Sequence, residues 1–388
     1  MSMNLTNTEV VIVGLGAMGS AAAYQLSKSS VRTIGIDQFS PPHNLGSSHG
    51  DTRVTREAIG EGPQFAPLAM RANEIWREIE TKVGQELLVQ CGVLMFADDP
   101  SMSPIHGSDG FLDLTIKTAK DLGIKHDLLD GAQLMRRFPQ FKFHGNEAAY
   151  LEHGGGFLWV ERCVDAQLKL AESNGVEISR GEKVISIDSG EAKRITVQTD
   201  RRRIEAETVV ITAGPWVNSF LPNDLQNKFT VYRQVLCWFE TDFELENAGP
   251  EAMPVFIRLG ETPEEMSYGF PCVDGPRGGI KAAAERWINP CDPDKANREV
   301  TAAEVDDIYN QLSDVVRIKN NCLRSATCLY TTTANFNFVI DRRPDNPHII
   351  VASPCSGHGF KHSAAIGEIL SQLALGKQTT LDISVFKF

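Results

Sequence analysis

The stretch "VVIVGLGAMGSAAAYQLSKSSVRTIGID" (residues 10–37) decides the fold, because it orders the parts of a nucleotide-binding βαβ unit. An apolar, β-branched run over 10–13 predicts a strand, and a run of mostly small residues over 17–27 predicts a helix. A second apolar run over 33–36 ends in Asp37. The turn between strand and helix has the spacing of the dinucleotide fingerprint, with Gly14, Gly16 and Gly19.

Each glycine of this fingerprint has its own expected task. Gly14 makes the tight turn, Gly16 lets the backbone approach a pyrophosphate, and Gly19 lets the helix pack closely on the strand. The start of the helix then faces the phosphates, because free N–H groups and the helix dipole favour an anion there. Asp37 can accept hydrogen bonds from the ribose hydroxyls and disfavours a 2′-phosphate. The expected cofactor is therefore NAD or FAD.

Composition limits the class of partner. The chain has 388 residues, which suits two domains, and its net charge of −12 argues against binding to nucleic acid. The eight cysteines are scattered and include no C-x-x-C pair, so neither a zinc site nor a disulfide framework is expected. The apolar run over 10–26 contains three glycines and has no basic residue before it, so it predicts neither a signal peptide nor a membrane span. We expect a cytoplasmic protein that binds a small molecule and no metal.

Two nucleotide-type units lie near opposite ends of the chain. The second, "HIIVASPCSGHGFKHSAAIGEILSQLAL" (348–375), again orders strand, glycine turn and helix. The expected class is α/β (α+β), with a Rossmann-like domain built from separated segments and a discontinuous, sheet-based substrate domain. The first domain is expected to take residues 1–90, 150–225 and 324–388, and the second to take residues 91–149 and 226–323.

The stretch "GSSHGDTRVTREAIGEG" (46–62) allows more than one interpretation. Its G-x-S-x-G pattern around Ser48 is that of a serine-hydrolase nucleophile, but two prolines in the preceding "SPPHNL" interrupt the strand that such a nucleophile needs. The stretch also places His49, Arg53 and Arg56 close to the nucleotide site. These side chains are either solvated charges or a positive group for phosphate, flavin or a substrate carboxylate.

Three further features have competing interpretations. His358 and His362 are four residues apart, as metal ligands on a helix are, but no third ligand is near, so a loop histidine and a solvent-facing helix histidine are expected. Lys281 stands in the apolar run "GGIKAAAERW", where it either reaches water or is a buried cation with a function. Cys328 in "SATCLYTTT" has the surroundings of an inert cysteine, and its alternatives are a nucleophile or a covalent cofactor anchor.

Taken together, these stretches resemble the monomeric sarcosine oxidase and N-methyltryptophan oxidase family, within the D-amino-acid-oxidase-like flavoproteins. The resemblance covers essentially the whole chain. It rests on motifs that occur in order: "GLGAMGS" (14–20), "PPHNLGSSHGDTR" (41–53), "GEG" (60–62), "TAGPWV" (212–217), "YRQV" (232–235), "YGFP" (268–271), "NRE" (297–299), "CLYT" (328–331), "FVID" (338–341), "SGHGFK" (356–361) and "DIS" (382–384).

The resemblance implies FAD as the cofactor and assigns residues to its site. It implies that the 8α-methyl group of FAD is attached to Cys328. It also implies that Arg56 and Lys361 bind the carboxylate of the substrate, and that Tyr268 and Glu285 lie in the substrate pocket. The implied contacts to FAD are Gly14, Gly16, Gly19, Asp37, Ser47, Arg53, Val184, Gly214, Cys328, Gly357, Gly359, Phe360 and Lys361.

For catalysis, the resemblance implies that Arg53 and His49 lie beside the flavin ring and that Lys281 lies where O2 reacts. The expected reaction oxidises an N-methyl or other secondary amino acid to an imine and reduces O2 to H2O2, so that an N-methyl substrate yields formaldehyde. Two alternatives share the fingerprint: a flavoprotein dehydrogenase with another electron acceptor, and an NAD-dependent dehydrogenase. The resemblance also implies a monomer.

The chain departs from the family pattern at two positions. The family has a histidine four residues after the lysine that matches Lys281, where this chain has Glu285. It has another histidine directly after the second arginine, where this chain has Glu57. Glu285 either favours a substrate with a second amine or pairs with Arg286. Both glutamates are therefore candidates for substrate specificity.

Overall fold

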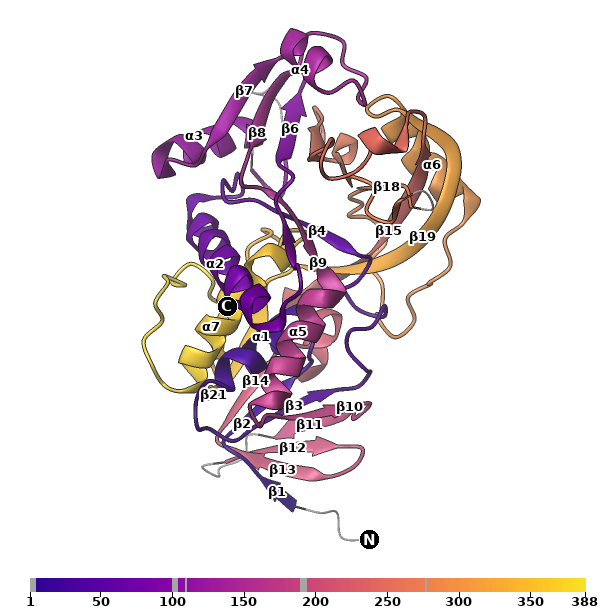
Figure 1. The fold of residues 1–388 in the computed structure, drawn as a ribbon. Coiled ribbons are helices and arrows are strands. Elements are labelled where there is room, and N and C mark those ends of the chain that lie inside the picture. Colours follow the sequence, from indigo (N-terminus) through magenta and orange to yellow (C-terminus); the bar gives the residue numbers. More distant parts are fainter. Residues whose placement is uncertain (1–4, 100–103, 109, 189–193, 276–277) are drawn as a thin grey trace.

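The computed structural model of the chain describes residues 5–99, 104–108, 110–188, 194–275 and 278–388. Within these residues the strands form four sheets, of six, eight, four and three strands. Figure 1 shows the six-stranded sheet in the lower half of the view, flanked by helices, and the eight-stranded sheet in the upper half.

The six-stranded sheet contains the fingerprint. Its neighbouring strands are parallel except for the last pair, and both faces of its central strands are buried, as a parallel sheet requires. The predicted βαβ unit is confirmed, with helix α1 (Ala17–Leu26) between the two predicted strands. The strand order is β10 (Glu177–Arg180), β3 (Thr33–Asp37), β2 (Val10–Val13), β14 (Thr208–Ile211), β21 (Asn346–Ser353) and β20 (Val339–Arg343).

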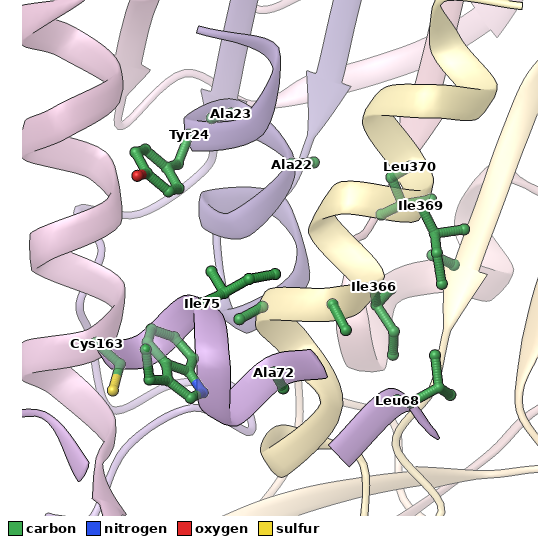
Figure 2. Packing of buried hydrophobic residues seen from close by; sticks show 14 of the residues in the cluster. Ala22, Ala23, Tyr24, Leu68, Ala72, Ile75, Cys163, Ile366, Ile369 and Leu370 are labelled. Carbon is green, nitrogen blue, oxygen red and sulfur yellow. The ribbon is translucent and has the colours of Figure 1, made fainter. Parts of the chain in front are cut away.

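Four helices share one hydrophobic core beside this sheet. They are α1, α2 (Ala66–Val83), α5 (Val160–Ser173) and α7 (Ser363–Ala374), and Figure 2 shows their apolar side chains pointing toward one another. Helix α7 lies very close to α1, because a Cβ on Gly367 would be 2.4 Å from the Cβ of Ala21. The second nucleotide-type unit, near the end of the chain, therefore packs directly on the first.

Gly19 sets the contact between α1 and the turn that precedes it. A Cβ at this position would lie 1.8 Å from the carbonyl oxygen of Gly14 and 2.8 Å from Thr212 Oγ1, which confirms its expected packing role. We therefore predict that Gly19→Ala lowers the free energy of unfolding by about 3 kcal/mol, because the backbone has to move apart. Gly154→Ala is the matched control, since its Cβ would meet only Gln90 Nε2, at 3.9 Å. Equal midpoints of urea unfolding for the two variants would contradict this packing role.

The eight-stranded sheet brings together distant parts of the chain. Helices α3 (Phe111–Leu122), α4 (Gly131–Arg137) and α6 (Ala302–Ser313) contribute buried apolar residues to its two cores. The long, curved β19 runs from this sheet toward the middle of the molecule (Figure 1). The strand order is β19 (Ile318–Thr332), β15 (Thr230–Thr241), β18 (Ile280–Ala284), β17 (Ser267–Phe270), β16 (Val255–Leu259), β6 (Val93–Ala97), β8 (Ala148–Glu152) and β7 (His126–Asp130).

The two smaller sheets complete the fold. The four-stranded sheet has the order β1 (Leu5–Asn7), β13 (Arg203–Ala206), β12 (Ile195–Thr199) and β11 (Val184–Asp188). The three-stranded sheet has the order β4 (Thr52–Thr55), β9 (Gly156–Trp159) and β5 (Leu88–Val89). The division into two domains stays a prediction, and β8 and β19 each run across one of its expected boundaries. Among the described helices, none has both the length and the apolar character needed to cross a membrane.

Candidate functional site

The larger of two adjoining cavities lies where parallel strands β2, β3 and β14 end, the edge at which doubly wound sheets bind their ligands. Its volume is about 460 Å³. Gly19, Cys328 and Lys361, three of the residues expected to contact FAD, lie outside its lining. The others line it: Gly14, Gly16, Asp37, Ser47, Arg53, Val184, Gly214, Gly357, Gly359 and Phe360.

The donor set at one end of this cavity fits a dinucleotide. Gly14 adopts φ +90°, which makes the turn, and the helix begins after Gly16, whose lack of a side chain leaves the helix start open to the cavity. This arrangement suits a pyrophosphate. The side chain of Asp37 is fixed at the end of β3, because its two oxygens accept hydrogen bonds from the N–H groups of Leu15 and Phe39, each at 2.8 Å. Ser48 Oγ accepts a hydrogen bond from the N–H of Ala17 at 3.2 Å, so this serine supports the helix start.

The smaller cavity, of about 80 Å³, shares lining residues with the larger one. Arg53, Tyr330, Gly357 and Phe360 line both, so a ligand in one contacts the wall of the other. The residues expected to bind the substrate all line it: Arg56, Tyr268, Glu285 and Lys361. Apolar side chains complete the wall: Val54, Ile105, Phe111, Ile257, Met266, Phe270 and Phe360.

Two cations converge on this small cavity. Arg56 follows β4 and is 3% exposed, and its Nη2 donates to Glu61 Oε2 at 3.0 Å while its Nη1 donates to the carbonyl of Ala58. Lys361 comes from the opposite end of the chain and donates from Nζ to the carbonyl of His358 at 2.6 Å. Burial lowers the pKa of Lys361 to about 7, against the effect of the Glu61 carboxylate. An anion that entered the cavity would therefore meet the Arg56 guanidinium and, below about pH 7, a second positive donor in Lys361.

Glu285 pairs with an imidazole that the sequence did not indicate. Its Oε2 lies 2.7 Å from His106 Nε2, whereas Arg286 Nη2 binds Asp307 at 3.0 Å, so the second alternative, an ion pair of Glu285 with Arg286, is wrong. Burial disfavours the charge on His106, but Glu285 and Glu61 raise its pKa to about 9. The negative charge of Glu285 is thus already balanced, which removes the reason to expect a second amine in the substrate.

Glu57 lies outside both cavities. Its Oε1 accepts a hydrogen bond from Asn73 Nδ2 at 3.1 Å, and its N–H donates to Glu152 at 2.6 Å. The expectation that Glu57 is a direct candidate for specificity is therefore not supported by its position. The neighbouring Glu61, in the quoted "GEG" motif, is the glutamate that reaches the cavity.

The histidines near the end of the chain differ from expectation in two respects, since His362 is buried and His358 has two other ligand-type side chains beside it. His362 is fully buried, because it packs against Phe65 and Phe338 at the start of α7, so the expected solvent-facing histidine is wrong. His358 is buried in the wall of the small cavity, and its ligand atoms converge with those of Glu61 and His106 within 4.8 Å. A metal cation there would lie among Arg56, Lys361 and a protonated His106, which opposes its binding.

Lys281 and His49 lie behind the cavity walls. Lys281, on β18, is 2% exposed, and its Nζ donates to the carbonyls of Gly50 and Thr52 at 2.6 and 2.7 Å. Burial and Arg53 lower the pKa of Lys281, while the two carbonyls favour its charged form. Burial, Arg53 and Lys281 lower the pKa of His49 to about 3, so this imidazole is neutral.

Cys328 is fully buried on β19, next to the wall of the larger cavity. Its Sγ lies 3.3 Å from Arg53 Nη2 and 3.5 Å from the carbonyl of Ser47, and both residues line the cavity. The cysteine that itself lines this cavity is Cys355. The Cys328 thiol thus contacts two residues of the cavity wall.

Comparison with known proteins agrees with this geometry. Residues 9–373 match the sequence pattern of the FAD dependent oxidoreductase family. The chain is 35% identical over 385 residues to the monomeric sarcosine oxidase of Bacillus sp. (strain B-0618), which covers 98% of this chain and 95% of that protein. It is 30% identical over 387 residues to the N-methyl-L-tryptophan oxidase of Yersinia pseudotuberculosis serotype O:1b (strain IP 31758), which covers 97% of this chain and 98% of that protein.

The fold is also known from solved structures. NikD, an unusual amino acid oxidase essential for nikkomycin biosynthesis, has a TM-score of 0.84 to this chain at 22% identity, over 98% of this chain and 97% of that chain. The glycine oxidase from Geobacillus kaustophilus has a TM-score of 0.75 at 17% identity, over 98% of each chain. The sequence match and the dinucleotide cavity lead to one conclusion: the chain belongs to the FAD-dependent oxidoreductase family.

Proposed function

We propose that this protein is an FAD-dependent oxidase of N-methyl or other secondary amino acids, which uses O2 as its electron acceptor. The observation that carries the proposal is the pair of buried cations, Arg56 and Lys361, in a small cavity that shares its wall with the dinucleotide cavity. Relatives named monomeric sarcosine oxidase and N-methyl-L-tryptophan oxidase support it. We further propose that the protein is a cytoplasmic monomer.

The residues of the small cavity select and orient the substrate. Arg56 presents a planar fork that suits a carboxylate, and Lys361 adds a second charge from another direction. A fixed carboxylate limits the positions that the amine and its neighbouring carbon can take, which lowers the entropic part of the barrier. Tyr268 lines the small cavity and Tyr330 lines both cavities. Their hydroxyls are 3.0 Å apart, and the two rings help to exclude water from the substrate.

FAD, when bound, supplies the two-electron chemistry at the substrate carbon and toward O2. Overall, an N-methyl amino acid, O2 and water give the demethylated amino acid, formaldehyde and H2O2. We assign Lys281 to the step with O2, because reduction of O2 builds negative charge and Lys281 Nζ is a donor that two carbonyls fix in a water-excluded place. Its Nζ lies 4.5 Å from the centre of the Phe270 ring, which lines the substrate cavity.

A pair of amines that differ only in the carboxylate tests the proposal. Sarcosine and dimethylamine carry the same N-methyl amine, and only sarcosine offers an anion to Arg56 and Lys361. We expect peroxide in air from sarcosine, N-methyltryptophan, proline or pipecolate, with no other electron acceptor added, and none from dimethylamine. Peroxide from dimethylamine at a similar rate, or none from any of these amino acids, would contradict the proposed function.

We also propose that FAD is attached covalently to Cys328, which adjoins the cavity-lining Arg53 and Ser47. Acid precipitation of the wild-type protein should leave the yellow colour in the pellet, and Cys328→Ser should release it into the supernatant. Cys355→Ser is the matched control, since Cys355 lines the same cavity and should be dispensable for attachment. A colourless wild-type pellet would exclude a covalent bond, and release by Cys355→Ser alone would move the bond to Cys355.

A further inference from the structure

Two buried carboxylates meet one imidazole in the wall of the substrate cavity. His106 Nε2 is hydrogen-bonded to Glu285 Oε2 at 2.7 Å. On its other side, His106 Nδ1 lies 3.4 Å from Glu61 Oε1, within ion-pair distance but without the alignment of a hydrogen bond. A small movement of Glu61 would complete this hydrogen bond, which a buried, protonated Nδ1 favours.

Glu61 is bound to Arg56 in the wall of the substrate cavity. Glu61 Oε2 accepts from Arg56 Nη2 at 3.0 Å, and the two side chains are 4% and 3% exposed. A substrate carboxylate that binds Arg56 through Nη2 competes with Glu61 for that nitrogen. Once displaced, Glu61 is a buried charge that needs another partner, because an unpaired carboxylate in the interior is strongly unfavourable.

Among the described donors beside Glu61, His106 is the one that suits this need. His358 Nδ1 is also near, at 3.7 Å from Glu61 Oε1, but burial, with help from Lys361, keeps the pKa of His358 well below its usual value, so this ring is neutral. Lys361 donates to the carbonyl of His358 and is assigned to the substrate. His106, by contrast, is held in its charged form by Glu285 on its far side.

We propose that His106 is a positioning residue, which donates its Nδ1–H to Glu61 when a substrate carboxylate displaces Glu61 from Arg56. This inference rests on the proposed function, in which Arg56 binds the carboxylate. Glu285 then has a defined task, since it fixes the ring through Nε2 and keeps Nδ1 as a donor. His106 lies in a tight turn with φ +49°, so its place in the cavity is set by the backbone of residues 104–108.

Binding of propionate, an unreactive carboxylate, to the FAD-loaded protein tests the proposal. Affinity is read from the change in flavin absorbance and from competition with sarcosine. His106→Gln should weaken propionate binding at least about tenfold, because displaced Glu61 has no charged partner. His153→Gln is the matched control, since His153 is also paired with a carboxylate, Asp127 at 3.1 Å, but is 45% exposed, and it should change the affinity less than about twofold.

A double-mutant cycle separates this role from a merely structural one. Glu61→Gln removes the competitor for Arg56, so this variant should bind propionate more tightly than the wild type. In the Glu61→Gln background, the added His106→Gln change should lower the affinity for propionate less than about threefold, because residue 61 then has no carboxylate charge for His106 to stabilise. An equal loss in both backgrounds would overturn the proposal, because His106 would then act without Glu61.

The pH dependence tests the proposal even if His106→Gln does not fold. The groups that face His106 are Glu285, Glu61 and the neutral His358 ring, and Trp287 and Phe336 complete its surroundings without charge. Glu285 and Glu61 raise the pKa of His106 to about 9, so its charge is present below pH 9 and lost above it. Propionate binding by the wild type should therefore weaken as pH rises through about 9.

The Glu61→Gln variant should lack this decline near pH 9. The decline from Lys361, which lies near pH 7 in the wild type, should occur at lower pH in Glu61→Gln, because Glu61 raises the pKa of Lys361. If propionate binding by Glu61→Gln also weakened as pH rises through about 9, the role of His106 would be overturned. A wild-type protein that binds no carboxylate at any pH would instead contradict the proposed function itself, so the two failures are distinguishable.

Discussion

Arg56→Ala is expected to lower kcat/KM for a carboxylate substrate by about 10²–10³-fold, the largest loss that a binding residue of the small cavity should produce. The guanidinium is 3% exposed, so water cannot replace the hydrogen bonds that it offers to a carboxylate. The loss should occur in KM and in the rate of flavin reduction together, because the carboxylate both binds and orients the substrate. Stopped-flow measurement of flavin reduction against substrate concentration checks this.

Two controls accompany Arg56→Ala. Arg56→Lys keeps the charge but not the planar fork, so it should recover part of the loss. Arg137→Ala removes an arginine whose pair with Asp127 is on the surface, with side chains 44% and 38% exposed, and should change kcat/KM less than about twofold. Unchanged propionate binding in Arg56→Ala would remove Arg56 from the substrate site.

Lys281→Met is expected to slow reoxidation of the flavin by O2 by about 10²–10³-fold, while reduction by substrate changes little. The reason is that Lys281 is held on the carbonyls of Gly50 and Thr52 and does not line either cavity, so it is placed to act on charge rather than to bind substrate. Methionine keeps the length of the side chain and its contacts with Trp238 and Phe270.

The two half-reactions have to be measured separately to test Lys281. Anaerobic reduction by substrate gives the first rate, and mixing of the reduced protein with O2 gives the second. Lys319→Met is the control, since Lys319 is 49% exposed and pairs with Glu240 on the surface. An equal decrease in both half-reactions of Lys281→Met would contradict a role in the step with O2.

The local parts of the fold were predictable because they depend on neighbours in sequence. The βαβ unit of residues 10–37 forms as its pattern of apolar runs and glycines indicates, and Gly19 packs where the fingerprint requires a residue without a Cβ. Arg56 and Lys361 lie more than 300 positions apart in sequence but line the same cavity. The family resemblance, and not their spacing, predicted that they share a site.

The residues that the sequence did not indicate are those whose partners are distant. His106 belongs to no motif, and it reaches the cavity only because the turn of residues 104–108 folds over it beside Glu285, which follows β18. His362 was expected in solvent because its neighbours in sequence do not indicate its contact with Phe65, which lies just before α2. Burial of a polar residue is decided by tertiary packing, which a periodic pattern cannot report.

The most direct test of oxidase activity follows the flavin of the purified protein through one full cycle. Anaerobic addition of a secondary amino acid such as sarcosine or N-methyltryptophan should bleach the flavin absorbance, NADH should not, and admission of air should restore the colour with about one H2O2 formed per flavin. Flavin that no amino acid bleaches, or that stays reduced in air until another acceptor is added, would contradict an oxidase of secondary amino acids.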